Sequence, residues 1–221
     1  MIKLENVSKT YQTRRGEVRA LQEANLTVQP GELVLVRGVS GSGKSTLLLT
    51  IGGMHRPSAG RVEVDGQDIF KLNPQGRAAF RRQHIGFVFQ TFHLVPYLSA
   101  VDNVLLAAVN ANGDKDAVRD RATTVLSDFG LASRLDHRPA SLSVGERQRT
   151  AVARAMLNEP KVILADEPTG NLDSENANQV FALLKSFTQA GGCVVAVTHS
   201  DHHDAIADRV LTLKEGQIQD A

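Results

Sequence analysis

The sequence predicts an α/β fold with a mostly parallel core sheet, an antiparallel β subdomain and an inserted α-helical subdomain. Two apolar runs, "KVILAD" (161–166) and "GCVVAVT" (192–198), have the pattern of buried strands, and a helical pattern separates them. The first 30 residues instead alternate apolar and polar side chains, which indicates antiparallel strands. From about residue 91 to residue 159 the pattern is helical, between two regions of strand pattern.

The elements before residue 91 follow in order. "IKLENV" and "VRALQEANLTVQPG" predict the first antiparallel strands, and "GRVEVDGQDI" predicts a hairpin with Asp65-Gly66 as its tight turn. "GELVLVRG" predicts a short buried strand that leads into a glycine-rich loop at 38–43, and "KSTLLLTIGG" predicts the helix after that loop. "HIGFVFQ" predicts a further strand.

The helical stretch has start and stop signals of its own. "SAVDNVLLAAVN" begins with a Ser-x-x-Asp cap, and "DKDAVRDRATTVLSDFG" ends towards Gly130. "SENANQVFALLKSFTQAGG" predicts the helix between the last two buried strands. Because strands return after residue 160, we interpret 91–159 as an insertion into one domain of residues 1–221, with the core and β subdomain at about 1–90 and 160–221.

Composition excludes several classes of protein. The 221 residues are 42% hydrophobic and 22% charged, which is a globular balance, and the net charge of +1 argues against a nucleic-acid partner. The single cysteine, Cys193, rules out an internal disulfide, suits a reducing compartment and is expected to be buried and inert. We find no signal peptide and no run near the roughly 18 apolar residues of a membrane span, so any membrane role would need a second chain.

The segment "GVSGSGKS", Gly38 to Ser45, fits the phosphate-loop pattern G-x-x-x-x-G-K-[ST]. Its backbone N–H groups and the positive end of the following helix would surround the β- and γ-phosphates of a nucleotide. Lys44 would neutralise phosphate charge, and the Ser45 hydroxyl would hold Mg²⁺. The predicted strand before the loop and the helix after it favour this interpretation over a chance glycine-rich turn.

Two acids follow a buried strand in "VILADE", Val162 to Glu167. Ligands bind at the carboxyl ends of strands in open parallel sheets, so Asp166 would hold the Mg²⁺ shell and Glu167 would polarise the attacking water. Adjacent acids at a strand end are alternatively plain solvated loop residues. The phosphate loop in the same chain favours the functional interpretation.

The phosphate loop, "SLSVGERQR" and "ADEPTGNLD", in that order, resemble the ATP-binding cassette (ABC) ATPases over essentially the whole chain. The resemblance implies a P-loop NTPase (RecA-like) core and Mg²⁺-dependent ATP hydrolysis, with Lys44, Glu167 and His199 as catalytic residues. The implied ATP-binding residues of the phosphate loop and its helix are Gly38, Ser40, Gly41, Ser42, Gly43, Lys44, Ser45 and Thr46.

Further roles come from the same resemblance. Gln90 would contact ATP and complete the metal ligands with Ser45 and Asp166, and His199 would lie near the γ-phosphate. Tyr11 would stack on adenine, although an exposed strand tyrosine is the alternative. A lone histidine after an apolar strand is otherwise usually structural, and we expect the rest of "HSDHHD" (199–204) to be solvated loop without a metal.

The segment "LSVGE" matches the family signature Leu-Ser-Gly-Gly-Gln, with Val144 and Glu146 as departures. In this family two ATPase domains pack head to tail, so Ser143, Gly145 and Glu146 would act on an ATP held by a second copy. Ser143-x-x-Glu146 is also a helix capping box, and both roles are compatible because a helix N-terminus favours an anion. Glycine in a first turn costs about 0.5–1 kcal/mol relative to alanine, which favours a phosphate approaching Gly145.

The implied assembly is a homodimer, with the "GNLD" loop and Asp173 crossing to the partner, bound to integral membrane permease subunits. The assembly would lie at the cytoplasmic face of the inner or plasma membrane, and no nucleic-acid partner is expected. "ADEPTGNLD" and "FQTFHLVPYLSAVDNV" resemble lipoprotein-releasing, macrolide-export and cell-division ATPases, and residues 91–101 are the expected permease contact. The alternatives are an ATPase that regulates an envelope hydrolase without transport, a soluble ABC ATPase acting on DNA or ribosomes, and the ATPase of a solute importer.

Overall fold

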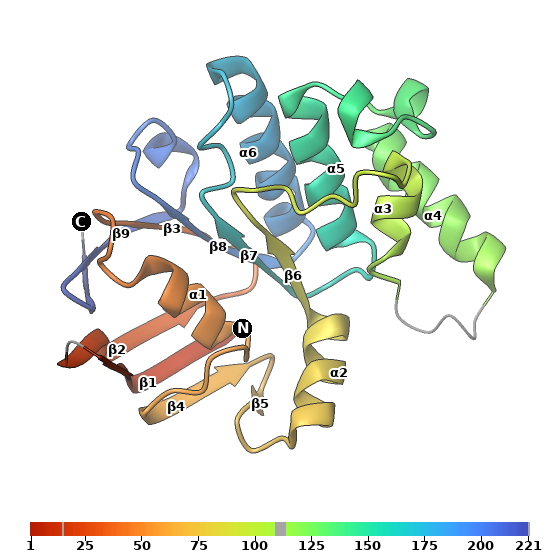
Figure 1. The fold of residues 1–221 in the computed structure, drawn as a ribbon. Coiled ribbons are helices and arrows are strands. Elements are labelled where there is room, and N and C mark those ends of the chain that lie inside the picture. Colours follow the sequence, from red (N-terminus) through yellow and green to blue (C-terminus); the bar gives the residue numbers. More distant parts are fainter. Residues whose placement is uncertain (15, 109–113, 221) are drawn as a thin grey trace.

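Two sheets and a group of helices build the molecule in a computed structural model that describes residues 1–14, 16–108 and 114–220 (Figure 1). The strands are β1 (Ile2–Thr13), β2 (Gly16–Val28), β3 (Leu33–Arg37), β4 (Ala59–Val64), β5 (Gln67–Asp68), β6 (Ile85–Val88), β7 (Val162–Asp166), β8 (Cys193–Thr198), β9 (Arg209–Lys214) and β10 (Gln217–Asp220). The α-helices are α1 (Lys44–Ile51), α2 (Pro74–His84), α3 (Ala100–Leu105), α4 (Lys115–Asp128), α5 (Val144–Met156) and α6 (Ser174–Gln189). Short 3₁₀ turns are η1 (Ala132–Arg134), η2 (Pro139–Ser141) and η3 (Asp204–Ile206).

The core sheet has the strand order β10-β9-β3-β8-β7-β6, parallel throughout except for β10. Its central strands are buried on both faces because consecutive side chains point to opposite sides. On β3, for example, Val34 and Val36 pack towards α1, whereas Leu33 and Leu35 pack towards α5 and α6. This two-sided burial explains the unbroken apolar runs in the sequence.

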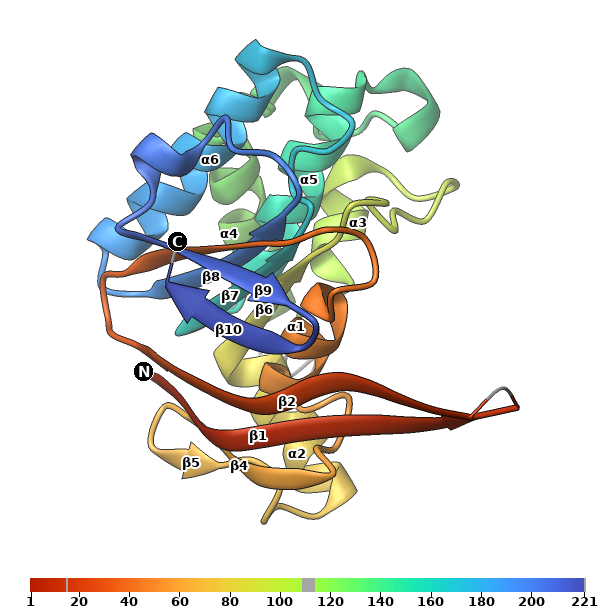
Figure 2. The ribbon, with the colours of Figure 1, turned by 90° about the vertical axis from the view of Figure 1, so that its left-hand side faces the viewer.

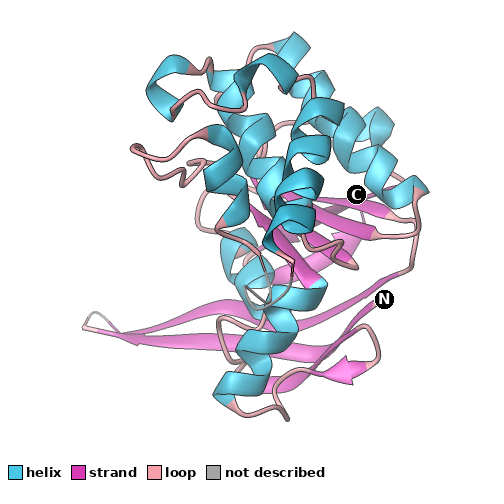
Figure 3. Ribbon diagram, turned by 90° about the vertical axis from the view of Figure 1, so that its right-hand side faces the viewer, coloured by secondary structure: helices cyan, strands magenta, loops and turns pink. Residues whose placement is uncertain are grey.

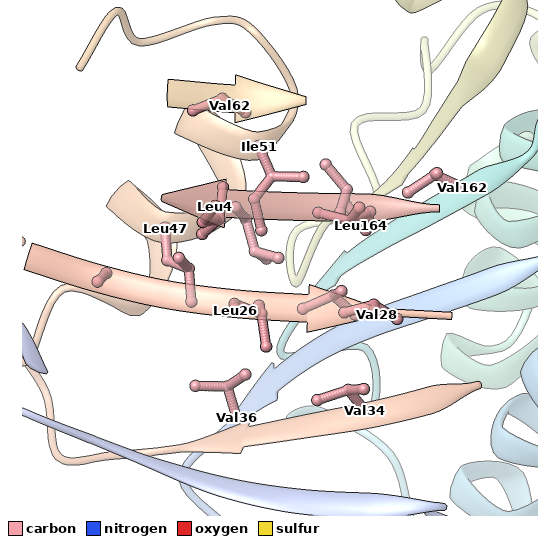
Figure 4. Packing of buried hydrophobic residues seen from close by; sticks show 14 of the residues in the cluster. Leu4, Leu26, Val28, Val34, Val36, Leu47, Ile51, Val62, Val162 and Leu164 are labelled. Atoms are coloured by element: carbon pink, nitrogen blue, oxygen red, sulfur yellow. The ribbon is translucent and has the colours of Figure 1, made fainter. Parts of the chain in front are cut away.

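The antiparallel sheet has the order β2-β1-β4-β5, and Figure 2 shows β1 and β2 running side by side and projecting beyond the body. The predicted turn between β4 and β5 is confirmed, with φ of 49° at Asp65 and 76° at Gly66. A continuous apolar core joins this sheet to α1 and to one face of the parallel sheet (Figure 4). Its members include Leu4, Leu26, Val28, Val34, Val36, Leu47, Ile51, Val62, Val162 and Leu164.

Helices α3, α4 and α5 enclose a separate apolar cluster that includes Val104, Leu126 and Leu157. Figure 3 shows a group of helices above the sheets and further helices lower down, across the strands. The predicted cap of α3 is present, because the Ser99 hydroxyl accepts from the Asp102 backbone N–H at 3.1 Å. Gly130 follows α4 with a φ of 73°. The last residues of the helix expected in 99–110 lie outside the described residues.

Three elements were not predicted from the sequence: α2, β9 and β10. Helix α2 contains no fully buried residue, so the apolar stripe that reveals most helices is weak. Its cap was a usable signal, because Asn73 precedes Pro74 and accepts from the Gly76 backbone N–H at 2.7 Å. Within the described part of the chain, no helix is both long enough and apolar enough to span a membrane.

Candidate active site

A cleft of about 580 Å³ lies at the carboxyl ends of β3, β8, β7 and β6, which are neighbours in the core sheet. This is the edge of an open parallel sheet where ligands bind, and the volume suits a nucleotide. Strands β1 and β2 add a wall from the antiparallel sheet. The lining residues are Tyr11, Val18, Arg19, Ala20, Ser40, Gly41, Gly43, Lys44, Ser45, Thr46, Gln90, Asp166, Glu167 and His199.

The phosphate loop joins β3 to α1 and is closed by its own lysine. Lys44 Nζ donates to the Gly38 carbonyl at 2.7 Å and to the Val39 carbonyl at 3.2 Å. Gly43 has a φ of 109°, and a Cβ atom there would collide with the Ala20 carbonyl of β2. The loop therefore needs this glycine to pack against the antiparallel sheet as well as to follow a tight path.

The far side of the phosphate loop rests on the turn between β9 and β10. The Ser42 carbonyl accepts from the Gly216 backbone N–H at 3.1 Å, and the Gly216 carbonyl accepts from the Gln22 backbone N–H at 2.8 Å. Segments near both ends of the chain thus brace the loop. No local sequence pattern predicts this support, because it joins residues far apart in the chain.

The two acids of "VILADE" emerge together at the end of β7. Burial raises the pKa of the Asp166 carboxyl, and the Glu167 charge adds to this, while the Ser45 hydroxyl bond and Lys44 oppose it. Ser45 and Asp166 present a hydroxyl and a carboxylate side by side, and Gln90 lines the same cleft. These hard oxygen donors fit Mg²⁺, which prefers a few protein oxygens together with substrate phosphate.

The side chains of Glu167 and His199 contact each other at the cleft. His199 Nδ1 lies 3.0 Å from Glu167 Oε1, and the Glu167 side chain is 12% exposed whereas that of His199 is 64% exposed. The Glu167 backbone N–H donates to the Val197 carbonyl at 2.9 Å, and its φ is 47°. The carboxylate is thereby held towards Lys44, whose Nζ lies 4.0 Å away.

Gln90 follows β6 and meets the loop after Glu167. The Asn171 amide donates to the Gln90 carbonyl at 3.3 Å, and a Cβ atom at Gly170 would lie 3.1 Å from Gln90 Nε2. The segment that leads into the helical cluster therefore contacts the "GNLD" loop directly. A movement of helices α3–α5 would therefore displace both Gln90 and the "GNLD" loop.

Tyr11 lines the cleft and is held by two residues that the sequence did not predict, His55 and Lys9. Its hydroxyl forms a 2.7 Å hydrogen bond with His55 Nδ1, and Lys9 Nζ lies 4.9 Å from the ring centroid. Val18, its cross-strand neighbour, is 50% exposed beside it. Tyr11 and Val18 form an apolar surface suited to a flat base. The role of His55 could not be predicted because it is 44 residues from Tyr11 in the sequence.

We expect His55→Ala to weaken ATP binding about threefold to tenfold, because loss of one hydrogen bond frees the Tyr11 ring. Binding of tripolyphosphate, which has no base, should not change. Titration calorimetry with both ligands would measure this. An equal loss for ATP and tripolyphosphate would contradict a role in base binding.

The signature turn (Leu142–Glu146) stands outside this cleft, at the start of α5. Its predicted capping box is confirmed, because Ser143 N–H donates to Glu146 Oε2 at 2.7 Å and Glu146 N–H donates to Ser143 Oγ at 3.1 Å. Arg134 Nε donates to Glu146 Oε1 at 2.8 Å. The Arg134 guanidinium and the Ser143 N–H lower the pKa of the Glu146 carboxyl. Both Glu146 oxygens are therefore engaged within the chain.

Glu146→Gln, which restores the family residue, should lower stability by up to about 1 kcal/mol at pH 7, because the amide keeps the cap but loses the ion pair with Arg134. The pKa of Glu146 is lowered from 4.5, so its contribution is complete above that pH and is lost as pH falls through the folded-state pKa. The difference in stability between the variant and wild type, measured by thermal unfolding, should be smaller near pH 3 than at pH 7. A difference that persists unchanged at the lower pH would contradict the assignment.

The remaining histidine-rich segment is only partly solvated, which corrects the expectation for residues 199–204. His203 stacks on Phe181 with centroids 4.1 Å apart, and Asp204 pairs with Arg37 at 3.0 Å. Across the described residues, no group of three or more His, Cys, Asp or Glu side chains could hold a metal ion. Burial raises the pKa of the Cys193 thiol to about 12, so this thiol is inert as predicted.

The fold and the cleft define a phosphate-loop nucleotide-binding protein of the α/β class. The sequence matches the family described as ABC transporter over residues 21–170, and the chain belongs to this family. It is 44% identical over 221 residues to the lipoprotein-releasing system ATP-binding protein LolD of Hyphomonas neptunium, covering 100% of this chain and 97% of the relative. It is 45% identical over 218 residues to the macrolide export ATP-binding/permease protein MacB 1 of Yersinia pestis bv. Antiqua, covering 99% of this chain but only 34% of that longer protein.

Solved structures of similar proteins also belong to ATP-binding cassettes and ABC transporter complexes. A dimeric post-hydrolysis state of the ATP-binding cassette MJ0796 bound to ADP and Pi superposes with a TM-score of 0.91 at 39% identity, covering 99% of this chain and 96% of that one. The cbiO1 protein of Clostridium perfringens, part of the ABC transporter complex cbiONQ, gives a TM-score of 0.87 at 31% identity, covering 98% and 86%. The predicted P-loop NTPase fold is thus confirmed, and the chain is an ATP-binding and ATP-hydrolysing subunit of the ABC type.

Proposed function

We propose that the chain hydrolyses Mg²⁺-ATP in a site completed by a second copy, and that opening and closing of this pair drives a membrane permease. The supporting observation is the separation of the two halves within one chain. The cleft holds the phosphate loop, Asp166 and Glu167, whereas Ser143 and Val144 are exposed at the start of α5 outside it. A head-to-tail pair of chains would bring each signature turn onto the other chain's triphosphate.

In this mechanism most of the catalysis is positioning and charge neutralisation. Lys44 turns from the loop carbonyls to the phosphates, and Glu167 accepts the proton of the attacking water. His199 holds the Glu167 carboxylate in place through the contact seen here. Ser45, Asp166 and Gln90 would hold Mg²⁺, which would neutralise charge developing on the phosphates.

The relatives support both partners of the proposed assembly. The MJ0796 cassette is dimeric in its solved structures. The macrolide export protein joins an ATP-binding part to a permease part in one chain, and LolD belongs to a lipoprotein-releasing system. We therefore propose a peripheral position at the cytoplasmic face of the inner membrane, with export or lipoprotein release as the process served. Within the chain, residues 91–159 would act as the helical subdomain of a single ATPase domain.

A groove of about 460 Å³ supports a permease contact beside the predicted segment 91–101. Its wall carries Phe87, Phe89 and His93, and Leu106 at its rim is 56% exposed. Met54, 43% exposed, lines the same groove, and a contiguous exposed apolar patch marks a binding site for another protein. We expect Leu106→Glu to lower the amount of the chain that co-purifies with membranes containing its permease, compared with wild type. ATP binding by the purified variant should be unchanged.

The shared site has a direct test in mixed dimers. Ser143→Arg chains should bind ATP but not hydrolyse it, and Glu167→Gln chains likewise. A mixture should regain activity, because the intact Glu167 of the first variant then faces the intact Ser143 of the second. ATPase assays on each variant and on the mixture measure this. A mixture no more active than its components would overturn the two-chain site.

A further inference from the structure

The side chain of Asn176, in the first turn of α6, links the signature turn to the loop that precedes α6. Its Nδ2 donates to both carboxylate oxygens of Asp173, at 3.0 and 2.9 Å, and its backbone N–H donates to Asp173 Oδ1 at 2.9 Å. Its Oδ1 accepts from Arg149 Nη1 at 3.0 Å. Every donor and acceptor of this amide therefore faces either the end of the "GNLD" loop or α5.

The same amide lies directly against the signature turn. A Cβ atom at Gly145 would collide with Oδ1 and Cγ of Asn176. Gly145 is buried although it lies in the first turn of α5. The glycine is therefore required by a contact within the chain, in addition to the phosphate approach inferred from the sequence. Without a side chain at 145, the turn rests on the α6 amide.

We infer that Asn176 is a positioning residue that presents the signature turn and the Asp173 loop together, as one unit, to the ATP held by the second copy. This inference rests on the two-chain site proposed above. The hydrogen bond from Arg149 and the packing against Gly145 fix α5 to α6 near their N-terminal ends. The bonds to Asp173 attach the preceding loop to the same amide, and both segments would meet the partner there. Misplacing a positioning group by about 1 Å costs on the order of 10²-fold in rate, so a partial loosening should cost about tenfold.

Asn176→Ala removes the amide without touching the nucleotide cleft of its own chain. We expect kcat of the homodimer to fall about tenfold, with ATP affinity unchanged because the phosphate loop is intact. Gln179→Ala is the matched control. Gln179 lies on the same helix and also accepts from Arg149 Nη1, at 2.6 Å, but it is one turn further from the signature. That variant should keep wild-type turnover.

Mixed dimers decide whether the effect acts across the interface. Chains carrying different affinity tags are co-purified, with a Glu167→Gln chain paired with wild type as the reference. When Asn176→Ala is placed in the Glu167→Gln chain, the remaining competent Glu167 faces the altered signature, and hydrolysis should fall about tenfold below the reference. When Asn176→Ala is placed in the other chain, the competent site faces an intact signature, and the reference rate should be kept.

Equal slowing in both arrangements, or slowing only in the second, would overturn the inference and indicate a role within the chain's own site. Failure of the Ser143→Arg and Glu167→Gln mixture would separately reject the shared site. Thermal unfolding checks that each variant is folded. If Asn176→Ala does not fold, Asn176→Ser provides the same comparison, because serine suits the first turn of a helix.

Discussion

Replacing Glu167 with glutamine is expected to lower the ATP hydrolysis rate by about 10²–10⁴-fold, the range for loss of a general base. Glutamine keeps the size of the side chain and can still contact His199, but it cannot accept a proton from water. ATP binding should be retained, because Lys44 and the phosphate-loop amides do not change. Steady-state ATPase assays and nucleotide titration would measure the two effects, and size-exclusion chromatography with ATP should show a stable dimer.

Glu159→Gln is the control for this prediction. The Glu159 side chain is 78% exposed and lies before β7, at the end of the strand opposite the cleft, so its loss should leave turnover unchanged. Normal turnover in Glu167→Gln would instead show that another group activates the water. The 3.0 Å contact with His199 would then be structural.

Replacing Lys44 with alanine is expected to lower kcat/KM by about 10²–10³-fold, as for loss of a preorganised charged donor at a reacting phosphate. Here ATP affinity should fall together with the rate, because Lys44 contacts the phosphates in the ground state too. The loss also frees the Gly38 carbonyl, to which Lys44 now donates at 2.7 Å. Fluorescent-nucleotide titration and ATPase assays would separate the two parameters.

Lys161→Ala provides the comparison for Lys44→Ala. Lys161 is exposed just before β7, at the end of the strand opposite the cleft, and the variant should match wild type. An unchanged kcat/KM in Lys44→Ala would contradict the assignment of Lys44 to the triphosphate.

The core of the fold was predictable because burial on two faces leaves a direct mark on sequence. Strands β7 and β8 are apolar at nearly every position, and each ends where a polar residue faces the cleft. The phosphate loop was predictable for a related reason, since a triphosphate needs backbone N–H groups, glycines and one lysine at fixed spacing. Asp166 and Glu167 followed from their place at a strand end. Their roles, like those of Gln90 and the signature, stay predictions until the variants are measured.

Most of the missed features depend on contacts between distant segments. His55 meets Tyr11 only because β1 and the end of α1 pack together, and neither residue carries a local motif. Asn176 resembled an ordinary residue of a helix first turn, and its contact with Gly145 appears only once α5 lies on α6. Helix α2 escaped notice for a different reason, because none of its residues is fully buried and its apolar stripe is weak. The solvated loop expected at 199–204 was partly wrong, since stacking of His203 on Phe181 left no pattern to find.

The brace that Gly216 gives to Ser42 has a consequence for biosynthesis. The loop at 38–43 leaves the ribosome early, but one of its supports is made about 170 residues later, at the β9–β10 turn. A nascent chain that has not yet extruded that turn lacks the hydrogen bond from Gly216 to the Ser42 carbonyl. We therefore expect the phosphate loop to be fully braced only after residue 216 has emerged.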